Sequence, residues 1–249
     1  MNTATSNAVL VQDLVDANHI LFHQRIVDAF GHVSARSAVQ DDRFLMARNV
    51  APGLVTAADM LEYEVASGEC TRADPPRLYL ERYIHSEIYK ARPDVMAVIH
   101  NHSPAVLPFG IVKGARLKPA CHMCGFLGEG PPVFEIRDSA GPASDLLIRD
   151  RELGAALART LGTARVVLMR GHGCTIVAES VRVAVYRAVY TEINARLLLQ
   201  ALALALGEVQ TLTPAEAETA RVTTEGQVDR PWLLWKQQAN EAMPRQSPP

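Results

Sequence analysis

The chain has 249 residues and a mass of 27.2 kDa, with 48% hydrophobic and 21% charged residues, which is typical of a folded globular protein. Its formal charge of −2 leaves no surplus of Lys and Arg to neutralise a phosphate backbone, so nucleic-acid binding is not expected. No apolar stretch is long enough to span a membrane and the N-terminus has no signal-peptide pattern, so we predict a cytoplasmic protein without a membrane partner.

The first hundred residues predict helices on either side of short strands. Apolar residues recur at steps of three and four over residues 8–30, which predicts one or two amphipathic helices that end at Gly31. The segments HVSARS, RFLMA and LEYEV within residues 32–65 are typical of antiparallel strands. A helix is predicted from Asp74-Pro75-Pro76 to the residue before Pro93, and a strand over residues 95–99.

The second half of the chain predicts a helix over residues 150–161, closed by Gly162, and two buried strands over residues 165–169 and 174–178. A long Ala- and Leu-rich helix should follow over residues 181–206. This order predicts one α/β domain over residues 8–207 with a partly antiparallel sheet. The extension over residues 208–249 should contain one short helix, a segment with Trp232 and Trp235, and a disordered end.

The four cysteines do not form a recognisable disulfide framework. Cys121 and Cys124 form a single CxxC motif, without the second pair that a structural zinc site needs. Two small buried thiols are the prediction, with redox chemistry or zinc binding as the alternative.

Two histidines two positions apart provide the first signal of chemistry. His100 and His102 follow the apolar segment AVI, and alternate residues of a strand project from the same face. Zinc, manganese, iron and cobalt all accept neutral imidazole nitrogen, so the pair can hold one cation. The alternative is that each is an ordinary surface or core histidine.

A third histidine, His172, lies in a Gly-His-Gly turn directly after the predicted strand that ends at Met169. Three protein ligands leave coordination positions open for a substrate, as a catalytic metal requires. Glu81 and His85 lie four residues apart on one face of the helix predicted from residue 74. Glu81 is therefore a candidate acid/base or fourth ligand, and the alternative is a solvated carboxylate paired with a nearby arginine.

These motifs, in this order, resemble the class II aldolase/adducin-head family, which contains the metal-dependent fuculose-phosphate and rhamnulose-phosphate aldolases. The resemblance extends from about Leu14 to Leu206. It implies a three-layer α/β fold with a largely antiparallel sheet between helices, and a homotetramer with sites at subunit boundaries. It also implies that one divalent cation, Mn²⁺ or Zn²⁺ with Fe²⁺ or Co²⁺ as alternatives, binds to His100, His102 and His172, and that Glu81 is the acid/base carboxylate.

The chain departs from the sugar-phosphate aldolases where those enzymes hold phosphate. Tyr79-Leu80 stands in place of Ser-Ser, His32 in place of Asn, and Ala47-Arg48-Asn49 in place of a Thr-Gly loop. An imidazole and a guanidinium suit a carboxylate better than a phosphate that needs hydroxyl donors. These variants, with LYLERYIHSEIY and the segment from His122 to Gly128, resemble the branch that contains 3-hydroxy-2-methylpyridine-4,5-dicarboxylate decarboxylase and the dihydroxyphthalate decarboxylases.

The resemblance therefore predicts a metal-dependent decarboxylase for a hydroxy-substituted aromatic or heteroaromatic dicarboxylate. His32, Arg48 and His122 are the candidate residues for binding a substrate carboxylate, and Glu81 or a water beside it would protonate the ring carbon. A first alternative is an aldolase that acts on a non-phosphorylated hydroxy-keto acid, and a second is a non-catalytic adducin-like binding module. Tyr186 and Tyr190 on the long helix are expected to be packing residues, and the alternative is that they reach the site of a neighbouring subunit.

Overall fold

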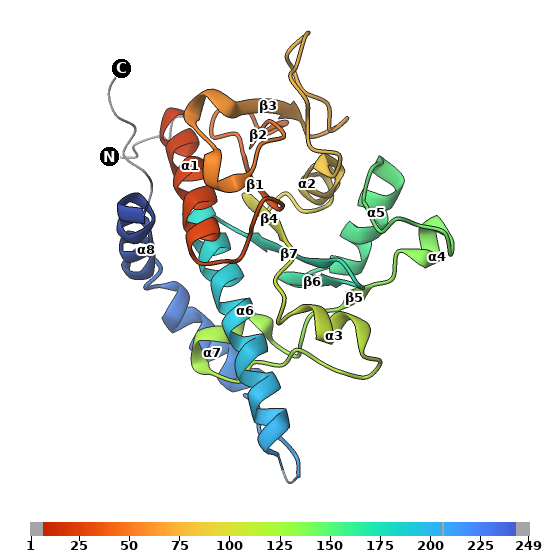
Figure 1. The fold of residues 1–249 in the computed structure, drawn as a ribbon, viewed down its shortest axis with the longest axis vertical. Helices are drawn as coiled ribbons and strands as arrows, with labels where there is room; N and C mark the ends of the chain where they lie inside the picture. The colour runs from red at the N-terminus through yellow and green to blue at the C-terminus, as the bar shows by residue number, and fades with distance from the viewer. Residues whose placement is uncertain (1–6, 206, 243–249) are drawn as a thin grey trace.

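A seven-stranded sheet forms the centre of the computed structural model, which describes residues 7–205 and 207–242 (Figure 1). The strand order is β3-β2-β1-β4-β7-β6-β5, and every neighbouring pair is antiparallel except β5 and β6. The strands are β1 (His32–Arg36), β2 (Arg43–Ala47), β3 (Met60–Glu64), β4 (Ala97–Asn101), β5 (Val133–Phe134), β6 (Val166–Met169) and β7 (Gly173–Ala178). The prediction of a mixed, largely antiparallel sheet in an α/β fold is confirmed.

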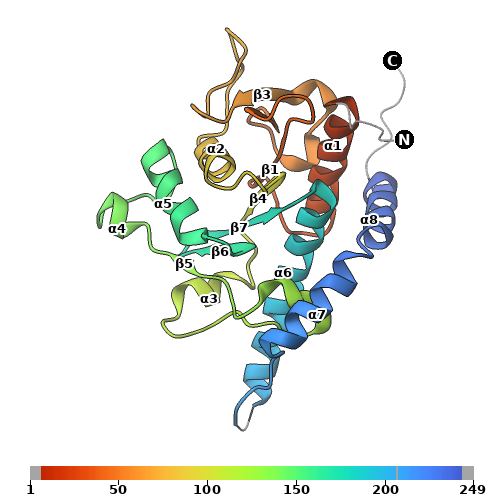
Figure 2. The same cartoon turned by 180° about the vertical axis from the view of Figure 1, so that it is seen from behind.

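Helices cover both faces of this sheet and complete the three layers (Figures 1 and 2). One face carries α2 (Arg82–Ala91) and α5 (Arg151–Leu161), and the other carries α1 (Asn7–His23) and α6 (Val181–Leu204). The remaining helical segments are α3 (Leu107–Ile111), α4 (Arg137–Ala140), α7 (Pro214–Glu225), α8 (Asp229–Ala242) and the 3-10 turns η1 (Pro52–Leu54), η2 (Ala57–Asp59) and η3 (His122–Leu127).

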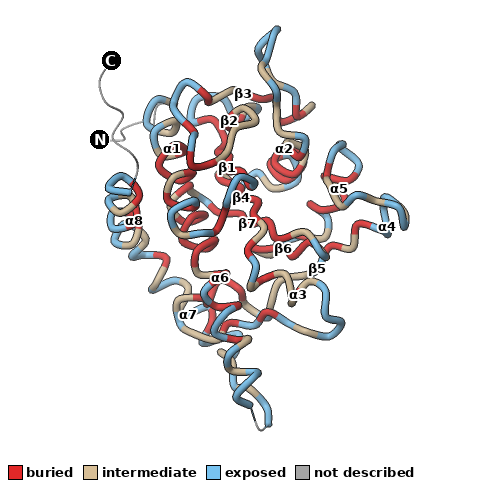
Figure 3. Tube along the Cα trace, viewed as in Figure 1, coloured by how far each residue is buried: buried red, intermediate tan, exposed pale blue. Residues whose placement is uncertain are grey.

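The two-residue periodicity of the central strands creates a core on each face of the sheet. On β4, Ala97 and Ile99 join the cluster beneath α1 and α6, whereas Val98 joins the cluster beneath α2 and α5. On β7, Ile176 and Val177 divide in the same way. The central strands are therefore buried on both faces (Figure 3), which gives the residues at their ends a rigid base.

Two of the predicted helices have the wrong boundary. The first helix ends at His23 and not near Phe30, because Arg25 takes a left-handed φ of 58° and the amides of Ile26 and Val27 both donate to the Leu21 carbonyl. The helix predicted from Asp74 begins only at Arg82. Neither proline of Pro75-Pro76 has an amide N–H, and the second keeps the first out of the helical region.

The C-terminal segment contains two helices, where one short helix was predicted. The helix α7 packs against η3, and α8 packs along α1 with Trp232 and Trp235 buried. The division of the chain at residue 207 stays a prediction, and the predicted disordered end, PRQSPP over residues 244–249, lies outside the described residues. No helix in the described ranges combines the length and apolarity that a bilayer span requires.

Candidate metal centre

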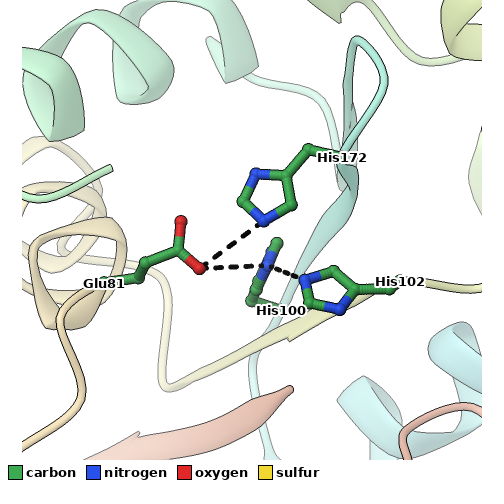
Figure 4. Close-up of side chains that lie close together, drawn as sticks. All are labelled: Glu81, His100, His102 and His172. Atoms are coloured by element: carbon green, nitrogen blue, oxygen red, sulfur yellow. Dashed lines mark hydrogen bonds and ion pairs between the residues drawn. The ribbon is translucent and has the colours of Figure 1, made fainter. Parts of the chain in front are cut away.

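Four side chains from three separate segments converge at one end of the central strands (Figure 4). His100 is the fourth residue of β4, and His102 is the first residue after that strand. His172 lies in the turn between β6 and β7, and Glu81 precedes the first turn of α2. One potential ligand atom from each of these four residues lies within 4.8 Å of the other three.

The distances within this cluster match those of ligands around a shared cation. Nε2 of His100 lies 3.1 Å from Nε2 of His102, and Oε2 of Glu81 lies 3.6 Å from Nε2 of both His100 and His172. Ligands that bind a tetrahedral zinc at about 2.1 Å are separated from each other by roughly 3.4 Å. The described atoms therefore fit a small divalent ion without rearrangement of the backbone.

The polar neighbours of His100 fix which of its nitrogens is free. Its Nδ1 lies 3.4 Å from Oγ1 of Thr175, and that hydroxyl donates to the sulfur of Met169 at 3.5 Å. Because the threonine hydrogen is already used, Nδ1–H of His100 donates to Thr175 and Nε2 keeps its lone pair. A hydrogen bond of this kind to the far nitrogen is typical of metal-binding histidines.

Burial keeps the three imidazoles neutral, as metal ligation requires. Desolvation lowers the pKa of His100 well below its ordinary value and lowers the pKa of His172 to about 4. The pKa of His102 is also lowered by burial, against an opposing effect of Asp28. At neutral pH, a cation would have no proton to displace from these nitrogens.

Two glycines permit His172 to reach the other ligands. Gly171 has a φ of +67°, which a residue with a side chain rarely adopts. A Cβ on Gly173 would lie 2.0 Å from the carbonyl oxygen of Asn101. Only a glycine therefore allows β7 to approach β4 closely enough to bring His172 beside His102.

Glu81 is oriented by the backbone of a distant segment. Its Oε1 accepts a hydrogen bond of 2.9 Å from the backbone N–H of Ile148, which turns Oε2 toward the histidines. Burial raises the pKa of Glu81 to about 7, although the Ile148 N–H acts in the opposite direction. The carboxyl group therefore carries a proton for part of the time at neutral pH, which suits an acid/base residue.

The predicted substrate-binding residues have three different surroundings. His32 on β1 is buried, and its ring centre lies 5.1 Å from that of His100. Arg48 follows β2 and uses its Nε to donate to Asp59 at 2.6 Å. His122 is exposed on η3, which packs against α7, and within the described residues no hydrogen bond or ion pair joins it to the four-residue cluster.

An open cavity of about 570 Å³ reaches the cluster at His102. Aromatic rings of Phe22 and Phe30 line it together with the basic residues His23 and Arg25. Phe30 lies 6.4 Å from His102 between ring centres and is 67% exposed. The cavity therefore combines an aromatic wall with both basic and acidic groups, because Asp28 also lines it and raises the pKa of His102 against the effect of burial.

The remaining candidates pack within the fold. The Cys121 and Cys124 sulfurs lie 3.5 Å apart as free thiols, Cys124 buried and Cys121 partly exposed. Tyr186 is buried, and its hydroxyl donates to the backbone carbonyl of Met123, as expected for a packing residue.

A group of polar side chains behind the cluster was not predicted from the sequence. Ser34 on β1, together with His85 and Tyr89 on α2, forms a buried hydrogen-bonded chain with His32. The signal was available, because His32 and Ser34 share a strand face and His85 and Tyr89 are four residues apart on a helix.

Known proteins with similar sequences and folds support this description. The family model described as Class II Aldolase and Adducin N-terminal domain matches residues 12–199. Decarboxylase tropJ of Talaromyces stipitatus is 38% identical over 92% of this chain and 93% of its own length. The 3,4-dihydroxyphthalate decarboxylase of a Terrabacter species is 32% identical over 82% of this chain and 85% of its own. The crystal structure of an aldolase II superfamily protein from Pseudomonas syringae shares the fold, with a TM-score of 0.76 at 19% identity over 97% of this chain and 95% of that one.

Proposed function

Because the chain belongs to the class II aldolase and adducin N-terminal domain family, we propose that it is a metal-dependent decarboxylase of hydroxy-substituted aromatic dicarboxylates. The observation that carries the proposal is the cluster of three neutral imidazoles and Glu81 in a chain whose similar relatives are named decarboxylases. Relatives that match most of the chain at 32% and 38% identity support a carbon–carbon lyase over a binding module. The dicarboxylate substrate class rests on the name of the Terrabacter relative.

His100, His102, His172 and Glu81 would hold the cation, and their donor set suits Mn²⁺ or Zn²⁺. When bound, the cation would act as a Lewis acid that stabilises the negative charge developing as the carbon–carbon bond breaks. Loss of carbon dioxide leaves an electron pair on the ring carbon. Glu81 would bind the cation before the substrate arrives. Once the substrate has taken its place, the carboxyl group of Glu81, whose pKa burial raises to about 7, would carry a proton and deliver it to that carbon.

The substrate would approach through the cavity at His102. Its aromatic ring would lie against Phe30, and the second carboxylate would be bound by His32 or by the terminal guanidinium nitrogens of Arg48, whose Nε bonds Asp59. We retain His122 as a candidate only for the site of a neighbouring subunit, because it is exposed and, within the described residues, makes no hydrogen bond or ion pair with the cluster of its own chain. This assignment requires the homotetramer that the family implies.

The experiment is an assay of purified protein with 3,4-dihydroxyphthalate as the probe, after removal of metal and after addition of Mn²⁺ or Zn²⁺. We expect stoichiometric release of carbon dioxide that depends on the added cation. Release of an aldehyde from hydroxy-keto acids, without carbon dioxide from the probe, would support the aldolase alternative. Absence of both metal binding and turnover would support a non-catalytic module.

A further inference from the structure

Four buried polar side chains form a continuous hydrogen-bonded chain behind the metal centre. The phenol oxygen of Tyr89 lies 2.7 Å from Oγ of Ser34, and this oxygen lies 2.6 Å from Nδ1 of His85. Nε2 of His85 lies 2.6 Å from Nδ1 of His32. All four residues are buried, with His85 and Ser34 fully excluded from solvent, so water cannot replace any of these bonds.

Counting hydrogens gives this chain a direction. Within the described residues, Ser34 is the one side chain that bonds the Tyr89 hydroxyl. Burial raises the pKa of Tyr89 and the backbone contact with Val98 lowers it, as an N–H donor does, so the phenol hydrogen is directed to Ser34. The hydroxyl of Ser34 also has a single hydrogen. With Tyr89 acting as the donor, that hydrogen is directed to Nδ1 of His85.

The same counting extends through the two imidazoles. Full burial disfavours a charge on His85 and lowers its pKa to about 3, so its ring carries one hydrogen. Because Nδ1 accepts from Ser34, the hydrogen lies on Nε2 and is donated to Nδ1 of His32. Because Nδ1 of His32 accepts this hydrogen, the ring of His32 carries its own hydrogen on Nε2.

We propose that Tyr89, Ser34 and His85 are positioning residues that hold His32 in the Nε2–H tautomer, so that His32 donates a hydrogen bond to the substrate and does not ligate the cation. This role in substrate binding rests on the proposed function. The ring centre of His32 lies 5.1 Å from that of His100, nearly as close as those of His102 at 4.9 Å and His172 at 4.8 Å. A protonated Nε2 has no lone pair for a metal, which explains how one of four adjacent imidazoles is kept outside the ligand set.

His100 and His32 take opposite tautomers, because Nδ1 of His100 faces a hydrogen-bond acceptor and Nδ1 of His32 faces a donor. Thr175 accepts from Nδ1–H of His100 and leaves its Nε2 as an acceptor, whereas His85 donates to Nδ1 of His32 and leaves its Nε2 as a donor. A donor beside the cluster would bind a substrate carboxylate or phenolate oxygen. A lone pair at the same position would repel that oxygen.

The direct test is nitrogen NMR of the full chain labelled with ¹⁵N-histidine, both metal-free and loaded with diamagnetic Zn²⁺. The His32 signals are identified by their loss in His32→Gln. We expect the long-range pattern of an Nε2–H tautomer for His32. An Nδ1–H pattern, or a cationic ring, would overturn the proposal whether or not the protein is active.

Tyr89→Phe tests the chain without changing either imidazole. Ser34 then has no donor from Tyr89 and can accept from Nδ1–H of His85, so the His32 signals should shift toward the Nδ1–H pattern. We expect KM for 3,4-dihydroxyphthalate to rise roughly tenfold with the bound zinc unchanged. Tyr63→Phe is the matched control, because the Tyr63 hydroxyl is buried without a partner among the described residues and its ring also packs on Phe44.

Equal His32 spectra in Tyr89→Phe and Tyr63→Phe would overturn the positioning role of Tyr89. His85→Gln should preserve KM, because the glutamine amide can donate to His32, and His85→Leu should not. Failure of the proposed function is distinguishable from failure of this inference. A protein with the Nε2–H tautomer that never releases carbon dioxide would contradict the function alone, and an active protein with the Nδ1–H tautomer would contradict the inference alone.

Discussion

At the scale of single residues, the surroundings of each ionisable group decide its chemistry more than its identity does. Glu81 and Glu135 show the contrast. Burial raises the pKa of Glu81 to about 7, whereas hydrogen bonds from Arg137 and Arg170 lower the pKa of the half-buried Glu135 to about 2. Only the first carboxyl group can exchange a proton near neutral pH.

Glu81→Gln tests the proton-transfer role. The amide keeps the volume and an oxygen for the cluster but cannot deliver a proton, so we expect retained metal and a fall in kcat of roughly 100-fold or more. The measurements are metal content and carbon dioxide release. Glu152→Gln, an exposed carboxylate at the start of α5, should behave as the unmodified protein. Near-normal kcat in Glu81→Gln would remove Glu81 from this role.

Cys121 should have an unusually acidic thiol. The neighbouring Cys124 sulfur stabilises its thiolate and is the main reason that the pKa of Cys121 falls to about 6. The thiolate is the reactive form, so its alkylation rate should rise with pH and level off above about pH 7. The measurement is site-resolved mass spectrometry after brief iodoacetamide treatment, with Cys121→Ser as the control. A rate that continues to rise past pH 8 would contradict this expectation.

At the scale of elements, the periodic segments could be predicted from the sequence and the irregular ones could not. The strand pattern of residues 32–65 and the helix at residues 150–161 are confirmed, because their apolar spacing matches burial on one or both faces. The ends of α1 and α2 could not be predicted. They depend on the left-handed Arg25 and on the arrangement of residues 72–81 against the rest of the fold, which no local pattern records.

The same distinction applies to the site. The motifs identified His100, His102, His172 and Glu81, and the structure brings these four together. The hydrogen-bonded chain from Tyr89 to His32 depends on the contact between α2 and β1, two elements that are distant in sequence. Its members could be recognised only as a shared face on each element, and the pairing of those faces is a property of the tertiary structure.

Gly173→Ala tests the close contact of β4 and β7 that places His172. The added methyl group would meet the Asn101 carbonyl at 2.0 Å, so one strand must move. We expect weaker metal binding and a loss of about 1–3 kcal/mol of stability, as for other overpacked sites. Calorimetry and metal titration measure both effects. Gly207→Ala is the control, since nothing lies within 4 Å of its added Cβ. An unchanged metal affinity in Gly173→Ala would show that this contact does not position His172.

At the scale of the whole molecule, the arrangement of helices leaves apolar surface that one chain does not cover. The end of α6 extends beyond the sheet layers (Figure 1), and Leu202 and Leu204 there are 51% and 81% exposed. On α8, Leu233 and Leu234 are also largely exposed. Exposed leucines on two helices are typical of surfaces that are buried in an assembly.

We expect a homotetramer in solution, which is the assembly that the family resemblance implies. Light scattering coupled to size-exclusion chromatography should give four times the chain mass of 27.2 kDa. Leu202→Glu with Leu204→Glu should shift the mass toward smaller species, while Val39→Glu, on the exposed turn between β1 and β2, should not. A monomeric mass at working concentration would contradict the assembly and the proposed role of His122 in a neighbouring site.

The central claim is that three imidazoles and one carboxylate share a single cation. Anomalous diffraction from crystals grown with Mn²⁺ or Zn²⁺, with data at the absorption edge of that metal, tests it most directly. We predict one anomalous peak per chain, within about 2.0–2.3 Å of Nε2 of His100, His102 and His172. A fully supplied crystal with no peak between these nitrogens, or with the metal bound elsewhere, would contradict the account.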